Sequence, residues 1–354
     1  YYFAVNVALL TGDFSWQILE FAGLKQLTAT PGEPAKLKKG QKGLSIITTR
    51  ITPALGVIVV FFLVLFPNIS PATATAMQAR FAPSDAWCSS LSWLKENTPD
   101  PFGDPHAYYG LHELPPSGES YKYPESAYGV MAWWDYGYWI TRIAHRIPNA
   151  NPSQSAVAVP KVARCFISQD EDSASEIVKE MDSSYIIIDY DVAVVSVVGG
   201  AVTGKFYAVA MWAGSSREEF FDIYYLPHEG KMMPILLFYP EYYRSLVVRL
   251  YNFDGKAVTP ESAIVISYQE KVSREGKPYK QITSAEPFTS YEEATAYISS
   301  QKSANYKIVN DNPFISPVPL EALKHYKLIH GSDSHSRHPS GKTVPSIKIF
   351  EYTD

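Results

Sequence analysis

The chain has 354 residues, more than one domain usually contains, so we expect two or more structural units. It carries 31 Lys and Arg residues against 36 Asp and Glu residues, which gives a net charge of −5 at pH 7. Proteins that bind nucleic acids need a dense positive surface to neutralise phosphates, so this composition argues against a nucleic-acid partner. Charged residues form only 19% of the chain, which indicates a membrane-embedded part joined to a larger soluble part.

The first fifty residues have the character of a membrane protein. Residues 1–23 begin with the apolar run YYFAVNVALL, without an initiator Met or a basic segment before it. We interpret them as the end of a transmembrane helix, so the chain is expected to be the carboxyl-terminal part of a larger protein. Residues 24–50 contain six Lys or Arg residues and one acidic residue, Glu33. Because short loops rich in Lys and Arg stay inside the cell, residues 24–50 are predicted to be a cytoplasmic basic loop.

Residues 51–69, ITPALGVIVVFFLVLFPNI, lie in a stretch without charge between Arg50 and Arg80. Their length and composition predict a transmembrane helix. A secretory signal peptide has a similar composition, but it would stand at the start of a precursor rather than well inside the chain. Pro53 fits the first turn of the helix, where its missing N–H would have no partner. A cytoplasmic loop before this helix places the residues after about 70 on the extracytoplasmic side.

Beyond the helix the sequence predicts a mixed α+β fold in three parts. Residues 70–221 are expected to form a mainly helical central domain, residues 222–310 a β-rich inserted domain, and residues 311–354 a return to the central domain with a tail. Local patterns in the central domain predict a helix that begins at Ser84 or Asp85, a helix over 173–181 and a buried strand over 184–190.

Residues 193–213 are apolar over a length that suggests a second membrane span. Two adjacent glycines interrupt this stretch, and Lys205 lies inside it. We therefore expect a buried helix or a hairpin that faces protein.

The predicted inserted domain contains short apolar segments separated by Pro and Gly turns, a spacing typical of an antiparallel sheet. The expected strands cover 232–239, 245–253, 262–272 and 278–284. Helices are predicted over 291–300 and from 319 to 326, and a closing strand over 345–352.

Cys88 and Cys165 are the only cysteines. An oxidising compartment would allow them to pair, whereas free cysteines are commonly buried as small apolar side chains. The sequence leaves both alternatives open.

The run WWDYG, Trp133 to Gly137, carries the most specific chemistry in the chain. Each indole supplies one N–H donor, and an ionised Asp135 only accepts, so together they complete both sides of a hydroxyl group's hydrogen bonding. Such a site would recognise a Ser or Thr side chain and reject analogues that lack the hydroxyl. Two alternatives remain at this point: an aromatic core in which Asp135 caps a helix, and a platform on which a sugar ring stacks. Stacking explains the rings but not the adjacent acid.

The motif and its flanks resemble the catalytic subunits of oligosaccharyltransferases, in particular their archaeal AglB type. The resemblance rests on WWDYG within AYGVMAWWDYGYWI and on the collinear blocks AHRIPNANP, GKFYAVAMWAG, YYRSLVVRLYNFDG, SPVPLEALKHYKLIH and KIFEY. It covers most of residues 84–354. It implies transfer of a preassembled glycan from a lipid carrier to the Asn of an N-x-Ser/Thr sequon on the outer face of the membrane.

The resemblance also implies roles for individual residues. It assigns the pocket for the sequon hydroxyl to Trp133, Trp134 and Asp135, with Tyr136 and Gly137 shaping the turn that presents them.

A second element of the family's pocket has the form Asp-x-x-Lys-x-x-x-Met/Ile. Lys205 and Val209 have the spacing of its second half, but Val202 stands where the acid is expected. Asp189 or Asp191 supplies the acid only if residues 194–202 are an insertion. Lys205 has the alternative of reaching solvent from an apolar surface.

The resemblance further implies a divalent metal, Mn²⁺ or Mg²⁺, held by carboxylates in the part of the protein that precedes Tyr1. We therefore expect no catalytic carboxylate and no metal ligand in this chain. The implied partners are an acceptor polypeptide with an N-x-Ser/Thr sequon, a polyprenyl-linked oligosaccharide and the membrane. The alternative function is a membrane-tethered carbohydrate-binding or scaffold module without catalysis.

Overall fold

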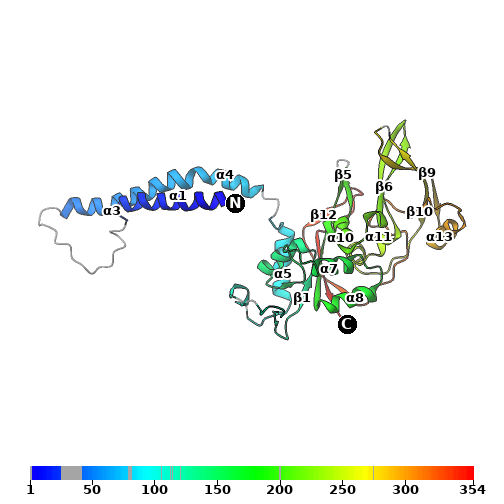
Figure 1. The fold of residues 1–354 in the computed structure, drawn as a ribbon, viewed down its shortest axis with the longest axis horizontal. Coiled ribbons are helices and arrows are strands. Elements are labelled where there is room, and N and C mark those ends of the chain that lie inside the picture. The colour runs from blue at the N-terminus through cyan, green and yellow to red at the C-terminus, as the bar shows by residue number, and fades with distance from the viewer. Residues whose placement is uncertain are drawn as a thin grey trace. The chain divides into compact units, whose positions relative to one another are not determined.

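The computed structural model describes residues 2–24, 42–78 and 82–354, apart from residues 105, 112, 114, 120, 199, 200 and 274. The chain divides into two compact units, Tyr1–Ala82 and Pro83–Asp354 (Figure 1). Each unit is described separately below.

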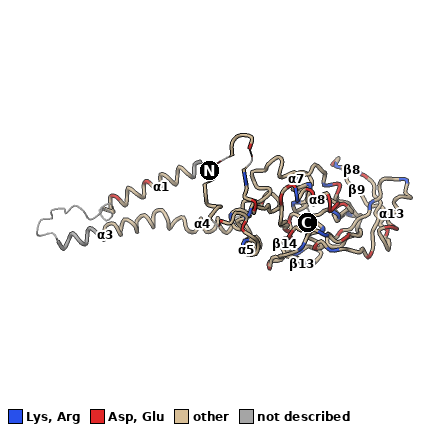
Figure 2. Tube along the Cα trace, turned by 90° about the horizontal axis from the view of Figure 1, so that it is seen from below, with Lys and Arg blue, Asp and Glu red and all other residues tan. Residues whose placement is uncertain are grey.

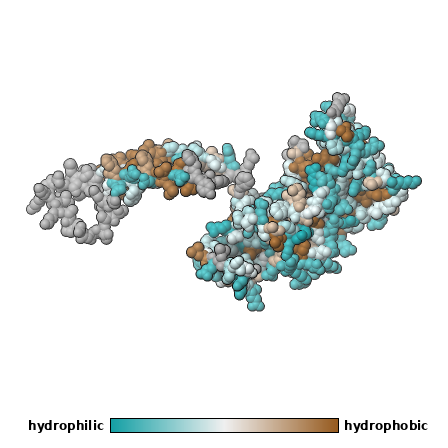
Figure 3. All heavy atoms as spheres, viewed as in Figure 1, coloured by the Kyte–Doolittle hydropathy of each residue, from teal (hydrophilic) through white to brown (hydrophobic). Residues whose placement is uncertain are grey.

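The first unit is helical. Helix α1 covers Tyr2–Phe21, and a second helical segment runs through α3 (Lys42–Val60), a π-helical turn (Phe61–Leu65) and α4 (Phe66–Met77). Within the described residues, the stretch Ile51–Met77 is long and apolar enough to cross a membrane, judged by length and composition. Figure 2 shows few charged residues along this stretch, and Figure 3 shows apolar side chains gathered on it.

The helix is longer at both ends than the sequence predicted. It begins at Lys42, so Pro53 lies inside α3 rather than in the first turn. It continues beyond residue 69 to Met77, and within this extension Thr73 and Thr75 donate their hydroxyls to the carbonyls of Ile69 and Pro71. The predicted basic loop over 24–50 lies mostly outside the described residues.

A five-stranded sheet forms the centre of the second unit, in the order β11-β14-β3-β1-β2. Strand β1 runs parallel to both β2 and β3, whereas β14 is antiparallel to β3 and β11 is antiparallel to β14. The strands are β1 (Gly129–Met131), β2 (Ile147–Pro148), β3 (Ser183–Asp189), β11 (Tyr326–Gly331) and β14 (Ile347–Tyr352). The strands predicted over 184–190 and 345–352 are confirmed by β3 and β14.

Helices pack around this sheet. The Ser84 hydroxyl accepts a hydrogen bond from the Trp87 backbone N–H and thereby begins α5, which ends before the extended Thr98. This confirms the predicted helix start, and α8 confirms the helix predicted over 173–181. The helices are α5 (Asp85–Asn97), α7 (Ala158–Ile167), α8 (Glu171–Glu180), α9 (Tyr190–Ala193) and α10 (Phe206–Ala213).

The central region holds more strand than the mainly helical domain that the sequence predicted. Strands β1 and β2 have three and two residues, which is too short to leave a periodic signal. The stretch over 193–213 forms the hairpin of β4 (Ser196–Val198) and β5 (Ala201–Thr203), followed by α10. It is therefore no continuous helix.

A second five-stranded sheet has the order β10-β8-β9-β6-β7. Glu229 and Gly230, both with positive φ, form the two-residue turn between β6 and β7. Figure 1 shows α13 beside β10. The elements are β6 (Phe221–His228), β7 (Lys231–Phe238), β8 (Ala263–Val272), β9 (Pro278–Phe288), α13 (Tyr291–Ser300) and β10 (Tyr306–Val309). The residue boundaries predicted for the domains stay predictions.

Two of the predicted elements are wrong. Residues 245–253 form helix α12 (Leu246–Phe253) instead of a strand, because a short continuous apolar run fits a buried helix equally well. Residues 319–326 form no helix. Their backbone N–H groups bond elsewhere: Leu320 pairs with Val258 in a β-bridge, and the Glu171 carboxylate accepts from two further N–H groups, those of residues 324 and 325.

Cys88 is exposed, Cys165 is buried, and both are free thiols.

Candidate functional site

The WWDYG motif follows the carboxyl end of β1. Residues Trp134–Tyr136 form a turn of 3-10 helix, which leads into the short helix α6 (Gly137–Trp139). Strand β3 runs parallel to β1 and ends at Asp189. Because the carboxyl ends of parallel strands meet at one edge of a sheet, this topology brings Asp189 to the motif.

Gly137 is required by a close approach of two backbone segments. A Cβ atom at this position would lie 2.5 Å from the Cα of Asn151, and it would also collide with the carbonyl oxygen of Ala150. Only glycine lets the turn after Tyr136 pack against residues 150–151. The residue thus fixes where the motif sits on the sheet.

The two tryptophans differ in exposure. Trp133 is only 2% exposed and belongs to the core, with its ring centroid 6.1 Å from that of Trp134. Trp134 is partly exposed, yet its indole Nε1 is buried and has no hydrogen-bond partner among the described residues. A buried N–H without a partner is costly, and because Nε1 has almost no exposed surface in this conformation, an acceptor reaches it only if the turn moves. Trp133 supports the motif from behind and does not reach the surface in this conformation.

Lys205 joins the motif to the end of β3. Its Nζ forms an ion pair with Asp135 Oδ2 at 2.5 Å and donates to the Tyr136 hydroxyl at 2.8 Å. The Tyr136 hydroxyl donates in turn to Asp189 Oδ2, while Asp189 Oδ1 accepts from the Val192 backbone N–H at 3.0 Å. The Lys205 and Asp135 side chains remain 31% and 27% exposed, so the outer end of this network is open to solvent.

The buried end of the network has shifted protonation equilibria. Burial raises the pKa of Asp189 to about 6, against the opposing effects of the Tyr136 hydrogen bond and the Lys205 charge. Burial, together with the neighbouring Asp189 carboxylate, raises the pKa of Tyr136 above its usual value near 10. Tyr136 therefore stays a neutral donor.

The β4–β5 hairpin places Lys205 beside the motif. The Lys205 backbone N–H donates to the carbonyl of Asp191, across the base of the hairpin. The hairpin thus lies between the acidic residues Asp189 and Asp191 and Lys205 in the chain. Val209, one helical turn further on, is fully buried in the core.

Sequence reasoning missed the role of Trp87. Its ring lies 4.1 Å from that of Tyr136, and it also meets Trp139 edge-on at 5.7 Å. Its signal was the apolar face of the helix predicted from Ser84, which had to pack against something aromatic or aliphatic.

A divalent metal does not fit the carboxylates of this site. Asp135 is paired with Lys205, and both oxygens of Asp189 accept hydrogen bonds. Within the part of the chain that the structure describes, no three His, Cys, Asp or Glu residues are grouped to hold a metal ion.

Comparison with known proteins finds several relatives that are named as protein glycotransferases. A family model of the AglB core domain matches residues 84–193. The chain is 30% identical over 288 residues to the dolichyl-monophosphooligosaccharide–protein glycotransferase AglB of Haloferax volcanii, covering 73% of this chain and 26% of that protein. It is 28% identical over 240 residues to dolichyl-phosphooligosaccharide-protein glycotransferase 3 of Archaeoglobus fulgidus, covering 61% of this chain and 26% of that protein.

One similar solved structure is the Archaeoglobus fulgidus oligosaccharyltransferase tethered with an acceptor peptide containing the NVT sequon via a disulfide bond. It matches with a TM-score of 0.46 and 19% identity, over 96% of this chain and 39% of that one. This chain spans about a quarter of the length of the curated relatives above.

Proposed function

We propose that this AglB-like chain serves as the carboxyl-terminal part of an oligosaccharyltransferase that transfers a lipid-linked oligosaccharide to the Asn of N-x-Ser/Thr sequons. Within that enzyme this region recognises the sequon's Ser or Thr hydroxyl. One observation carries the second statement: the buried Trp134 N–H lacks a partner among the described residues and is followed in the chain by the partly exposed Asp135 carboxylate.

A hydroxyl group uses both of these groups at once. Its oxygen accepts from the Trp134 indole, and its hydrogen is donated to the Asp135 carboxylate. Lys205 holds the Asp135 carboxylate in place through their ion pair, so that the carboxylate is positioned as an acceptor. Trp133, Tyr136, Gly137 and Val209 then position the pocket from the core side.

The sequon Asn needs further groups that we assign to other parts of the enzyme. An amide nitrogen is a poor nucleophile because its lone pair is delocalised into the carbonyl. Its activation requires carboxylate acceptors, and a divalent metal, Mn²⁺ or Mg²⁺, would neutralise the phosphate of the leaving lipid carrier.

The same proposal sets the topology. The stretch Ile51–Met77 crosses the membrane, and the unit Pro83–Asp354 lies on the extracytoplasmic side, where it meets the acceptor polypeptide. The lipid-linked glycan approaches from the membrane.

The test is a glycosylation assay on the full-length enzyme with acceptor peptides that differ only at the third sequon position, Thr, Ser or Ala. The wild type should glycosylate the Thr and Ser peptides and leave the Ala peptide essentially unmodified. Trp134→Phe removes the N–H and keeps a ring. It should lower turnover of the Thr peptide about tenfold. The ratio of transfer to the Thr peptide over transfer to the Ala peptide should fall as well.

Trp93→Phe is the matched control, because Trp93 stacks on His330 outside the motif, with ring centroids 4.5 Å apart. It should leave the preference for Thr unchanged. Asp135→Ala should abolish transfer. Equal transfer to all three peptides by the wild type, or an undiminished Thr preference in Trp134→Phe, would refute the assignment of the pocket. Absence of any transfer would favour the module without catalysis.

A further inference from the structure

A cavity of about 330 Å³ lies between the Pro-rich loop after α5 and the segment that follows the WWDYG motif. This volume falls in the range of small-molecule sites, roughly 300–1,000 Å³. The residues that line it are all described, although the loop contains positions that are not. The cavity adjoins the back of the motif, since Asn151 lines it and also packs against Gly137.

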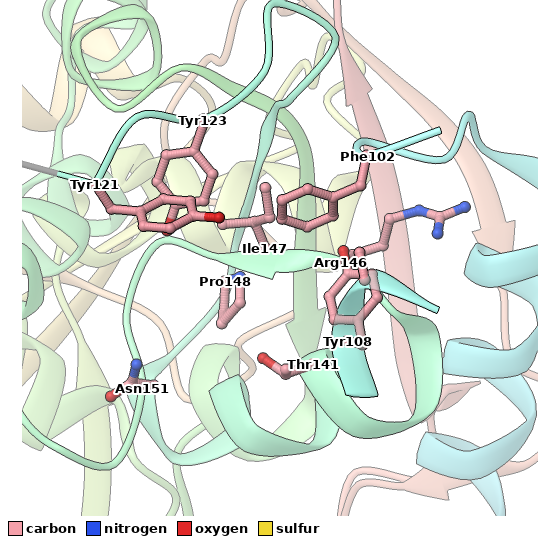
Figure 4. A pocket seen from close by; sticks show the side chains of 10 residues that line it. Phe102, Tyr108, Tyr121, Tyr123, Thr141, Arg146, Ile147, Pro148 and Asn151 are labelled. Carbon is pink, nitrogen blue, oxygen red and sulfur yellow. The ribbon is translucent and has the colours of Figure 1, made fainter. Parts of the chain in front are cut away.

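Aromatic rings form one wall. Phe102, Tyr121 and Tyr123 lie above Pro148 in Figure 4, with Ile147 between Phe102 and Tyr121. Tyr121 and Tyr123 pack edge to face with centroids 4.8 Å apart. Such faces carry negative π density and attract the C–H hydrogens of a saturated ring.

Residues with polar side chains also line the cavity. The Tyr108 hydroxyl is buried, and the described part of the chain offers it no hydrogen-bond partner. The ring itself is held by stacking on His145 at 5.1 Å and by edge contact with Phe102 at 5.2 Å. A phenol fixed in this way, with an unused hydroxyl, points to a ligand that carries hydrogen-bonding groups.

Asn151 supplies donors from the opposite side. Its Oδ1 accepts from the Ser153 backbone N–H at 2.9 Å, and because only an oxygen can accept there, this bond fixes the orientation of the amide. The Nδ2 group therefore points the other way, toward the Tyr121 side of the cavity in Figure 4. Thr141 adds a hydroxyl at the base of the cavity.

Arg146 also lines the cavity but does not make it an anion site. Its three guanidinium nitrogens donate to Thr98 Oγ1 at 2.8 Å and to backbone carbonyls, including those of Lys95 and Thr98 at the end of α5. The carbonyl end of a helix carries partial negative charge, which offsets the cation. The donors left for a ligand are thus neutral.

We propose that this cavity binds one pyranose ring of a neutral saccharide. A pyranose presents C–H hydrogens to the aromatic wall and hydroxyls to Tyr108 and Asn151. A proline ring or an aliphatic side chain would also stack, but it would leave both polar groups without partners. The inference goes beyond the proposed function, which requires no saccharide site in this region.

The experiment measures saturation-transfer-difference NMR and isothermal titration on the chain in lipid nanodiscs, which avoid glycoside detergents. The probes are maltotetraose, mannotetraose and chitotetraose, with a hexaproline peptide as the competing ligand class. We expect transfer to the ring C–H protons of at least one saccharide and none to hexaproline. Tyr108→Phe should weaken that saccharide's affinity roughly tenfold without lowering the thermal unfolding temperature, because the hydroxyl loses no internal bond.

Two variants sharpen the result. Asn151→Asp keeps the oxygen that accepts from Ser153 and removes the amide donors, so it should also weaken binding. Tyr109→Phe is the control, because Tyr109 is exposed and its hydroxyl bonds to His145 outside the cavity lining. Absence of saccharide binding, binding of hexaproline instead, or equal affinity in Tyr108→Phe and wild type would overturn the proposal. None of these results depends on sequon recognition, which the glycosylation assay tests separately.

Discussion

Lys205 and Asp135 are 70 residues apart in the sequence, and their side chains form an ion pair of 2.5 Å. The Lys205 Nζ also lies 4.4 Å from the centroid of the Tyr136 ring, so the cation contacts two consecutive residues of the motif. This arrangement ties the start of α10 to the turn after β1. The position of Asp135 consequently depends on the hairpin that delivers Lys205.

Lys205→Met should lower the free energy of unfolding by about 1 kcal/mol, since the ion pair is partly exposed and therefore partly screened. Urea denaturation of the chain followed by tryptophan fluorescence measures the change. Lys277→Met is the control, because Lys277 forms a more exposed pair with Glu275 at 3.6 Å. It should show no measurable change, and an equal loss in both variants would argue against a structural role for Lys205.

Asp189 should give the stability of the protein a characteristic pH dependence. Its pKa is raised to about 6 in the folded state, above its ordinary value of 3.8. Between pH 4 and 6 the unfolded chain has released this proton while the folded chain retains it. The free energy of unfolding therefore falls as pH rises through this window, and ionisation of Asp189 accounts for about 3 kcal/mol of the fall. Above pH 6 this loss is complete, and Asp189 causes no further change with pH.

Asp189→Asn removes the titrating group and should flatten that fall. One of the hydrogen bonds from Tyr136 and Val192 is lost as well, which adds a constant cost of about 1 kcal/mol at every pH. Urea titrations at pH 4, 5, 6 and 7 separate the slope from the offset. The same slope in variant and wild type would show that Asp189 ionises normally.

Gly137→Ala should destabilise the protein by roughly 2–3 kcal/mol, because the added methyl group collides with the backbone of residues 150–151, which has no room to yield. Gly331→Ala is a matched substitution, since its Cβ would meet only the Pro345 ring at 3.3 Å. We expect it to cost less than 1 kcal/mol. Thermal unfolding by circular dichroism compares the two, and a similar loss in both would contradict the close approach at Gly137.

Arg146→Met should cost about 3 kcal/mol, because it removes the guanidinium donor from the buried carbonyls of Ala144 and His145 and from the partly buried carbonyls at the end of α5. Arg142→Met provides the comparison, because Arg142 is exposed and lies 5.7 Å from the Tyr109 ring centroid. Its expected cost is below 1 kcal/mol. Hydrogen exchange of the amides near Thr98 should accelerate in Arg146→Met alone.

Local signals in the sequence located several elements of the fold. The Ser84 cap and the apolar run of β3 were predicted from capping and periodicity, which depend on neighbouring residues only. Helix α12 was predicted as a strand because its apolar run has no distinguishing period. The extended segment after Pro319 depends on partners at Val258 and Glu171, which lie far away in the sequence.

The candidate site, too, was predictable from the sequence only in part. The motif itself was visible as five consecutive residues, whereas the link from Asp189 through Tyr136 to Lys205 required knowledge of the hairpin between them. The burial of Trp133 and the unpaired N–H of Trp134 in the described structure arise from packing on both sides of the turn. No local pattern distinguishes two adjacent tryptophans in this respect.

The second five-stranded sheet, β10-β8-β9-β6-β7, is assembled from two separate stretches of chain, residues 221–238 and 263–309. Between them, α11 (Pro240–Arg244) and α12 return to the main core, where Tyr243 and Leu250 are fully buried. A single deletion that removes this sheet would therefore also remove α11 and α12, whose side chains form part of the core beside β3. Engineers who wish to transplant or trim it must therefore make two cuts and rejoin the chain on either side of these helices.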